Sequence, residues 1–154
     1  RMEAAEARIR RGDTMAVLFI DLDHFKSVND LLGHATGDAV LRAVADRLRG
    51  SSRGDEVVAR LGGDEFAVLH GPLAEAKDAA ALADRIIKAM AEPFDVEGHH
   101  VLIGASIGIA IAPQDGIDSN GLYKAADDAM YRAKNRGGGV VTFADEEMPQ
   151  IHAI

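Results

Sequence analysis

The run from Arg60 to Leu69 (RLGGDEFAVL) constrains the fold most, because two glycines and two acids separate two apolar, strand-like segments. Glycine and acidic residues are frequent in tight turns. The run therefore predicts a hairpin whose strands are Val57 to Leu61 and Phe66 to Leu69. Its tip would hold Asp64 and Glu65. Carboxylate oxygens are the ligands that Mg²⁺ prefers, so this hairpin is a candidate site for metal-assisted phosphate chemistry.

Apolar periodicity divides the rest of the chain into helices and strands. Continuous apolar runs predict buried strands, and apolar residues three or four apart predict helices. The predicted elements are a helix ending at Arg11, strand Met15 to Asp21, helices His24 to Leu32 and Asp38 to Leu48, strands Val57 to Leu61 and Phe66 to Leu69, helix Ala74 to Ala91, strands Phe94 to Val96 and His99 to Ile111, helix Asn120 to Arg136, and strand Val140 to Phe143. From the first strand onward the order is βααββαββαβ, which favours an α/β (α+β) fold with helices on a mostly antiparallel sheet.

Length and composition favour one globular domain. The 154 residues suffice for one hydrophobic core, with 47% apolar and 27% charged residues. The absence of Cys excludes disulfides and thiolate metal sites, and the net charge of −8 argues against a nucleic-acid surface. No apolar run could span a bilayer and no secretory signal is visible, so we expect a cytoplasmic domain, although a longer parent protein could be membrane-anchored.

The domain is expected to be a piece of a larger protein, because Arg1 is not a natural start. Residues 1–12, rich in Ala, Glu and Arg, are predicted to be the end of an upstream helix. Residues 13–144 form the predicted domain, and residues 145–154 a C-terminal linker.

A second pair of acids, Asp21 and Asp23, lies at the end of the first strand. If that strand neighbours the hairpin, three or four carboxylates meet at one sheet edge, where metals could stabilise both the attacking and the leaving oxygen of a phosphoryl transfer. Asp21 and Asp23 point to the same side of an extended chain, whereas Asp64 and Glu65 point apart unless the turn bends them. Taken alone, turn acids are usually solvated surface charges, and Asp23 is more typical of a helix N-cap.

Four blocks together resemble the GGDEF family of diguanylate cyclases. They are DLDHFKSVNDLLGHATGDAVL (residues 21–41), RLGGDEF (60–66), SIGIA (106–110) and ADDAMYRAK (126–134), and they occur in family order. The resemblance implies the palm-like fold of polymerases and nucleotide cyclases. It also implies condensation of two GTP molecules into cyclic di-GMP and pyrophosphate, two Mg²⁺ or Mn²⁺ ions per active site, and catalysis by a homodimer in which each domain holds one GTP.

The resemblance also assigns roles to residues of the acidic edge. Asp21, the Leu22 carbonyl, Asp64 and Glu65 match the metal-binding positions. Asp64 also matches the acid that helps to deprotonate the attacking 3′-hydroxyl, with Glu65 as the second catalytic acid.

Other matched positions would bind the nucleotide. Asn29 and Asp38 resemble the pair that reads guanine, and a carboxylate can accept hydrogen bonds from the guanine N1–H and 2-amino group. The phosphate-binding positions are the backbone from Asp23 through His24 and Phe25 to Lys26, the glycines Gly62 and Gly63, and the cations Lys26 and Lys134. Helix starts and glycine-rich turns suit phosphates. Without the resemblance, Asn29 and Asp38 would be interpreted as helix-surface and helix-cap residues, and the lysines as solvated charges.

The sequence departs from the family pattern at two places. Gly138 stands where the family usually has a phosphate-binding Arg, so we expect weaker triphosphate binding or slower turnover, because glycine lacks the guanidinium fork. The product-inhibition motif Arg-x-x-Asp aligns with Arg53 to Glu56, where Glu56 replaces Asp. Product binding could survive in weakened form, or the segment could be an ordinary solvated loop.

Two functions remain open from the sequence. The first is a diguanylate cyclase. The second is a GTP-binding regulatory module that controls an attached EAL phosphodiesterase, because the tail from Phe143 to Met148 resembles the linker of tandem GGDEF–EAL proteins. The intact Gly62–Phe66 turn favours catalysis, and the missing Arg at position 138 favours regulation.

Overall fold

The computed structural model describes residues 2–54, 56–145 and 151–152. Its elements are α1 (Met2–Arg10), β1 (Met15–Asp23), α2 (Phe25–Leu32), α3 (His34–Ser51), β2 (Glu56–Gly62), β3 (Glu65–His70), α4 (Lys77–Ala91), β4 (Phe94–Val96), β5 (His99–Val101), β6 (Gly104–Ala112), α5 (Ser119–Asn135), β7 (Val140–Phe143) and β8 (Ile151–His152). Residues 146–150, 153 and 154 of the predicted linker lie outside the described residues, as does Asp55 of the predicted product motif.

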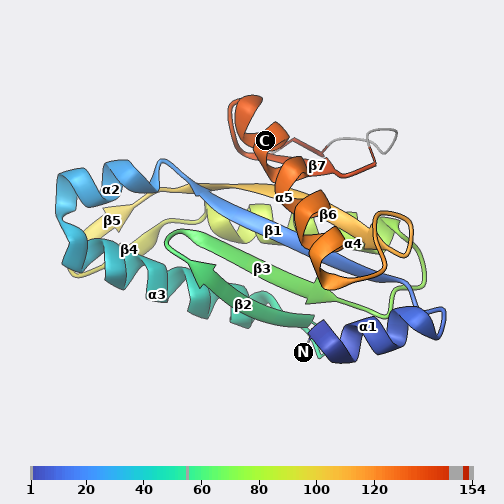
Figure 1. The fold of residues 1–154 in the computed structure, drawn as a ribbon. Coiled ribbons are helices and arrows are strands. Elements are labelled where there is room, and N and C mark those ends of the chain that lie inside the picture. Colours follow the sequence, from blue (N-terminus) through green and yellow to red (C-terminus); the bar gives the residue numbers. More distant parts are fainter. Residues whose placement is uncertain (1, 55, 146–150, 153–154) are drawn as a thin grey trace.

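A six-stranded sheet forms the centre of the domain, in the order β2-β3-β1-β6-β7-β8. Strand β1 is antiparallel to both β3 and β6, and β6 is parallel to β7. Strands β4 and β5 form a separate hairpin beside α2 and α3 (Figure 1). The continuous apolar sequence of β1 follows from this place, because a strand in the middle of a covered sheet buries both of its faces.

The pleat of β1 divides its side chains between two hydrophobic clusters. Leu18, Ile20 and Leu22 face the cluster built by α2, α3 and α4. Val17 and Phe19 face the cluster that contains the inner side of α5 and Ile9 of α1. Because side chains alternate along a strand, Asp21 and Asp23 continue the second face. The two acids therefore project on the side of the sheet that α5 covers.

The predicted fold class is confirmed, and the largest differences from the predicted elements are the following. The expected strand from His99 to Ile111 is two strands, since β5 pairs with β4 and β6 joins the central sheet. Helix α3 begins at His34 rather than Asp38, because Gly33 has a φ of 90° and its carbonyl accepts the first helical hydrogen bond, from Gly37. Helix α4 begins at Lys77 rather than Ala74. None of the helices in the described residues has the length and hydropathy needed to cross a membrane.

Gly108 fixes the distance between α5 and the sheet. A Cβ atom at this position would lie 2.2 Å from the carbonyl oxygen of Ala126 and 2.3 Å from the amide nitrogen of Met130. Both are backbone atoms of α5, so a side chain at position 108 can be accommodated only by moving the helix. Gly108→Ala should therefore destabilise the domain by about 3 kcal/mol, as overpacking in a core does.

Urea unfolding of the purified variants checks this expectation. Gly50→Ala is the matched control, because no atom lies within 4 Å of a Cβ built at this exposed position of α3. The control should be neutral or slightly stabilising, since alanine favours helix over glycine by about 1 kcal/mol. Equal midpoints for the two variants would contradict the close packing at Gly108.

Candidate active site

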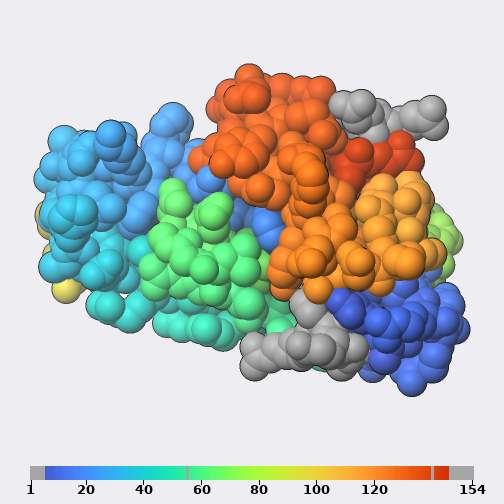
Figure 2. All heavy atoms as spheres, in the orientation of Figure 1, coloured from blue at the N-terminus to red at the C-terminus, as the bar shows by residue number. Residues whose placement is uncertain are grey.

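The end of β1 and the β2–β3 turn meet at one edge of the sheet. Asp21 lies directly opposite Glu65 in the β1–β3 ladder, so their side chains start on the same face. The Leu22 amide donates a hydrogen bond to the Asp64 carbonyl, with an N–O distance of 3.2 Å. In the space-filling view, blue atoms of β1 are visible between the green hairpin and the orange helix α5 (Figure 2). The structure thus places Asp64 and Glu65 beside Asp21 at this edge, and Asp23 follows Asp21 on the same face of β1.

The turn itself depends on its two glycines. Gly62 and Gly63 have φ values of 145° and 51°, which side-chain-bearing residues rarely adopt. The Arg60 guanidinium donates to the Gly63 carbonyl from Nε and Nη2, at 3.2 and 3.0 Å. The bulge between Arg60 and Gly62 bends the hairpin. This bend lets Asp64 approach Asp21 although Asp64 and Glu65 are adjacent in sequence.

The electrostatics of the edge are dominated by Asp21. Its Oδ1 atom is buried without a hydrogen-bond partner among the described residues. Burial, followed by the neighbouring Asp64 carboxylate, raises the pKa of Asp21 to about 6, and the Lys134 ammonium opposes this rise. Lys134 Nζ lies 3.2 Å from the Leu22 carbonyl and 3.4 Å from Asp21 Oδ2. The free protein therefore already holds a positive charge between these oxygens.

The donor set suits a hard divalent cation. Within the described ranges, no three His, Asp or Glu side chains are grouped as metal ligands. Two carboxylates and a carbonyl are nevertheless enough for Mg²⁺, which keeps several waters or substrate phosphates in its shell. The Asp21 oxygen without a partner and the raised pKa of its carboxyl indicate that the single Lys134 ammonium does not balance the negative charge of this edge. The residues present therefore fit the metal that the resemblance implies.

The two predicted guanine readers lie on neighbouring helices. A Cβ built at Gly37 would lie 1.8 Å from Asn29 Oδ1, so the Asn29 side chain of α2 rests against α3 at this glycine. Asp38, the next residue, is exposed. Helix α3 begins a full turn earlier than expected, so the idea that Asp38 caps its positive end is wrong. The structure brings Asn29 next to the residue that precedes Asp38.

The start of α2 differs from the prediction at Asp23. The cap position is taken by His24, which has a φ of 65° and makes no side-chain cap bond. Asp23 is not an N-cap, because its Oδ1 accepts from Ser106 Oγ at 2.7 Å and its Oδ2 from the Gly139 amide at 2.8 Å. Phe25 is buried and Lys26 exposed. The predicted phosphate-binding backbone from His24 to Lys26 thus lies at a helix start whose cap residue, His24, is left-handed.

The predicted product-binding residues line a cavity of about 270 Å³ on another part of the domain. Glu56 is buried there, and Arg85 Nη2 donates to both of its carboxylate oxygens, at 2.9 and 2.6 Å. The Arg53 amide also donates to Glu56, and His70 Nδ1 lies 3.6 Å from it. The alternative of a solvated loop is wrong for Glu56, whose side chain is 2% exposed.

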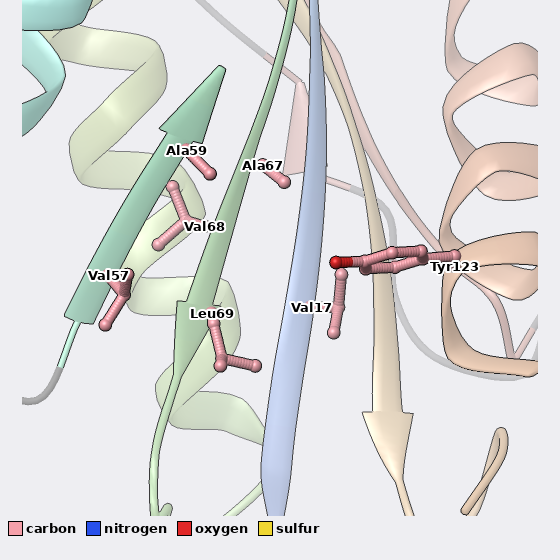
Figure 3. A pocket seen from close by; sticks show the side chains of 7 residues that line it. All are labelled: Val17, Val57, Ala59, Ala67, Val68, Leu69 and Tyr123. Carbon is pink, nitrogen blue, oxygen red and sulfur yellow. The ribbon is translucent and has the colours of Figure 1, made fainter. Parts of the chain in front are cut away.

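A smaller apolar cavity of about 90 Å³ lies between the sheet and Tyr123 of α5 (Figure 3). Val17, Leu69 and Val57 line it, and no acid does. It lies on the face of the sheet that carries Asp21, but the Tyr123 hydroxyl is the only polar side-chain group among its seven lining residues, which is too little to orient a nucleotide. The acidic edge therefore remains the candidate site.

Three supporting residues were missed by the sequence analysis. Arg60 holds the turn, Ser106 binds Asp23, and Gly37 accommodates Asn29. Arg60 and Ser106 lie inside the sequence motifs that resemble the family (residues 60–66 and 106–110). A sequence motif does not indicate which backbone carbonyl or carboxylate a polar side chain contacts. Gly37 gave a usable signal, because a glycine inside a helix that remains stable usually has a packing reason.

Comparison with known proteins identifies the family of the chain. The sequence model described as "Diguanylate cyclase, GGDEF domain" matches residues 1–139. The chain belongs to the GGDEF family. The match includes the segment 1–12 that the sequence analysis assigned to an upstream helix, and the boundaries at residues 12 and 144 stay predictions.

Individual GGDEF proteins show the same likeness. The chain is 44% identical over 146 residues to the bifunctional diguanylate cyclase/cyclic di-GMP phosphodiesterase MucR of Pseudomonas aeruginosa, covering 95% of this chain and 21% of MucR. It is 47% identical over 140 residues to the diguanylate cyclase TpbB of the same species, covering 90% of this chain and 32% of TpbB. The chain thus spans about a fifth to a third of these relatives.

Solved GGDEF domains have the same fold. The crystal structure of the TpbB GGDEF domain matches with a TM-score of 0.90 at 45% identity, covering 94% of this chain and 91% of that one. A structure of the coiled coil and GGDEF domain of DgcB from Caulobacter crescentus, in complex with c-di-GMP, matches with a TM-score of 0.81 at 28% identity. It covers 92% of this chain and 76% of that one. The palm-like architecture is therefore that of this chain.

Proposed function

We propose that the domain is a diguanylate cyclase that condenses two GTP molecules into cyclic di-GMP and pyrophosphate, working in the cytoplasm. The observation that carries this proposal is the pairing of the Asp21 and Asp64 carboxylates beside the Leu22 carbonyl and Lys134. Structural GGDEF domains have no need to hold two repelling carboxylates at a buried edge, which costs stability. The cost is understandable where divalent cations neutralise the carboxylates and at the same time hold the phosphates of the nucleotide.

Each residue at the edge has a definite task in this proposal. Asn29 and Asp38 hold guanine, and Lys26 and Lys134 bind the triphosphate. Mg²⁺ or Mn²⁺, held by Asp21, the Leu22 carbonyl, Asp64 and Glu65, supplies positive charge to the transition state. Asp64 accepts the proton of the 3′-hydroxyl. The 3′-oxygen then forms a bond to the α-phosphorus of the facing GTP while the bond to pyrophosphate breaks. The same step from the facing domain closes the ring, so that two pyrophosphates leave for each cyclic di-GMP formed.

Two domains must face each other for this reaction, because each would hold one GTP. The experiment is to incubate the domain, fused to a dimerising coiled coil, with GTP and Mg²⁺ and to detect cyclic di-GMP by liquid chromatography. The fusion separates failure to dimerise from failure of the chemistry. An Asp64→Asn fusion serves as the inactive control. Tight GTP binding without product in the parent fusion would refute the cyclase.

The second candidate is a GTP-binding module that regulates an attached phosphodiesterase. Gly138 favours it, because the family's phosphate-binding Arg is absent, and the similarity to bifunctional MucR is consistent with it. Bound GTP without turnover, together with altered activity of an attached EAL domain, would support this function instead.

Gly138→Arg tests how much the missing guanidinium matters. A Cβ at Gly138, where φ is 79°, would lie 2.7 to 2.9 Å from the Asp23 carboxylate, so any side chain there is strained. Gly138→Ala is therefore the matched control, since it carries the strain alone. We expect Gly138→Arg to bind GTP about tenfold more tightly than Gly138→Ala, because a charge-assisted phosphate contact contributes about 1.5–3 kcal/mol. Equal affinities, measured by calorimetry, would remove the guanidinium argument.

Product inhibition is a further part of the proposal. Arg53 and Arg85 would bind the phosphates of cyclic di-GMP at the cavity that they share with Glu56. Arg85 would have to give up part of its pairing with Glu56, so we expect weaker binding than an Asp at position 56 would permit. Calorimetry with cyclic di-GMP should show binding by the parent and its loss in Arg53→Ala. Absence of binding by the parent would end this part of the proposal.

A further inference from the structure

Asp23 differs from Asp21 in that its carboxylate is engaged within the protein. Asp23 is 8% exposed, and it accepts one hydrogen bond from Ser106 on β6 and one from the Gly139 amide. Ser106 is fully buried. The carboxylate therefore joins the end of β1 to β6 on one side and to the segment after α5 on the other. Neither the metal nor the nucleotide roles proposed above use these two bonds.

The segment that Asp23 holds consists of the most flexible backbone available to a protein. Gly137, Gly138 and Gly139 all have positive φ values, of 101°, 79° and 64°. Three successive glycines lose much conformational entropy when they are ordered, so an anchor is needed to keep one conformation. The Gly138 backbone lies directly over the Asp23 carboxylate, where a Cβ would be too close. The loop and the acid are thus fitted to each other.

The loop follows directly on the helical turn that carries Lys134. Helix α5 ends at Asn135, and the Gly137 amide donates to the Lys134 carbonyl. Lys134 Nζ lies 3.6 Å from Asp23 Oδ1 and reaches the Leu22 carbonyl and Asp21. A helix end frays unless its last turn is tied down. Fraying here would move Lys134 away from the acidic edge.

We propose that Asp23 is a positioning residue that anchors the glycine loop, residues 137–139, to the end of β1 and thereby holds Lys134 at the acidic edge. The anchor itself is independent of what the site does. Its effect on nucleotide binding rests on the proposed function.

Two substitutions separate the hydrogen bonds of Asp23 from its charge. In Asp23→Asn, the amide oxygen can still accept from the Gly139 amide and the NH₂ group can donate to Ser106 Oγ. Asp23→Ala removes both bonds. Asp128→Asn on the exposed side of α5 is the control, because it removes a carboxylate that pairs with Lys124 at the surface.

Hydrogen exchange of the nucleotide-free domain is the first measurement. Asp23→Ala should speed exchange of the Gly139 amide and of the segment 134–139, whereas Asp23→Asn and Asp128→Asn should leave both near the parent rates. Unchanged exchange in Asp23→Ala, or equal acceleration in Asp23→Asn, would overturn the anchor. If Asp23→Ala does not fold, the exchange rate of the Gly139 amide in the parent is the test. An unprotected Gly139 amide in the parent would also overturn the anchor.

Affinity for a fluorescent GTP analogue with Mg²⁺ is the second measurement. We expect Asp23→Ala to weaken it about tenfold, as loss of a supporting contact usually does at metal sites, and Asp23→Asn to weaken it less. Equal affinities of Asp23→Ala and the parent would overturn the positioning role. If the parent binds no analogue, this result counts against the proposed function. The hydrogen-exchange rates would still test whether Asp23 anchors the glycine loop.

Discussion

An Asp21→Asn variant should form no detectable cyclic di-GMP and yet unfold at a higher temperature than the parent, when both are free of metal and nucleotide at about pH 8. The loss of activity follows from removing a metal-binding oxygen in the proposed mechanism. The gain in stability follows from burial and the adjacent Asp64, which raise the pKa of Asp21 to about 6. The ionised carboxylate therefore opposes folding, and neutral asparagine does not.

The pH dependence of the stability gain shows whether ionisation of Asp21 causes it. The pKa of an unfolded aspartate is about 4, so below that pH the Asp21 carboxyl is protonated in both states and carries no penalty. The penalty grows as pH rises from about 4 to 6 and is complete above that range. Two pKa units would correspond to about 3 kcal/mol, and partial exposure reduces this to about 1–2 kcal/mol. We expect a melting temperature about 3–6 °C higher at pH 8 and little difference at pH 4.

The test is to measure the melting temperatures of the parent and of Asp21→Asn at both pH values, with and without excess Mg²⁺. Mg²⁺ should stabilise the parent and have little effect on the variant, because a ligand stabilises only the state that binds it. Asp128→Asn, on the exposed side of α5, should show neither effect. A stability gain of the same size at pH 4 would show that ionisation of Asp21 is not its origin.

A Gly37→Ala variant should remain folded and lose most of its affinity for GTP. The new Cβ would occupy the place of Asn29 Oδ1, at a separation of 1.8 Å, and Asn29 Cγ lies only 2.9 Å away. The obstacle is the end of a flexible, half-buried side chain, so Asn29 can turn away while α2 and α3 stay packed. Alanine also favours the helix. Losing the hydrogen bonds of Asn29 to guanine should weaken GTP binding about 10-fold.

A double-mutant cycle shows whether Gly37 acts through Asn29. Asn29→Ala should weaken GTP binding by a similar factor, and the double variant should be no weaker than either single one. Binding of ATP should be little affected, since the two residues are proposed to read guanine. Additive losses from Gly37→Ala and Asn29→Ala would show that the glycine has another role.

The sequence predicted the parts of the site that depend on a single local pattern. The short apolar run before Asp21 favoured a buried strand, and the Gly62–Gly63 step favoured a turn. The acidic edge followed from these two predictions, because β1 and β3 are neighbours in the sheet. The start of α3 was placed wrongly, because Gly37 looks like a helix boundary. In the folded protein Gly37 lies inside the helix, where it leaves room for Asn29.

Contacts between distant segments could not be predicted in this way. Asp23 looked like a helix cap, since its local sequence contains no sign of Ser106 or Gly139, which lie 83 and 116 residues further on. For Glu56 the sequence left product binding and a solvated loop both open, because nothing near it in the chain shows that Arg85 from α4 pairs with its carboxylate. In both cases a polar side chain is satisfied by a partner that only the complete fold supplies.

The central place of β1 has a consequence for how the domain can be dissected. Its end pairs with the β2–β3 hairpin on one side and β6 on the other, and α5 closes over it with Lys134. Such long-range pairings form slowly and only together. A fragment that lacks any one of these segments should hold no part of the acidic edge in place. The smallest unit that can be transplanted between proteins with its chemistry intact must therefore contain β1, the β2–β3 hairpin, β6 and α5 together.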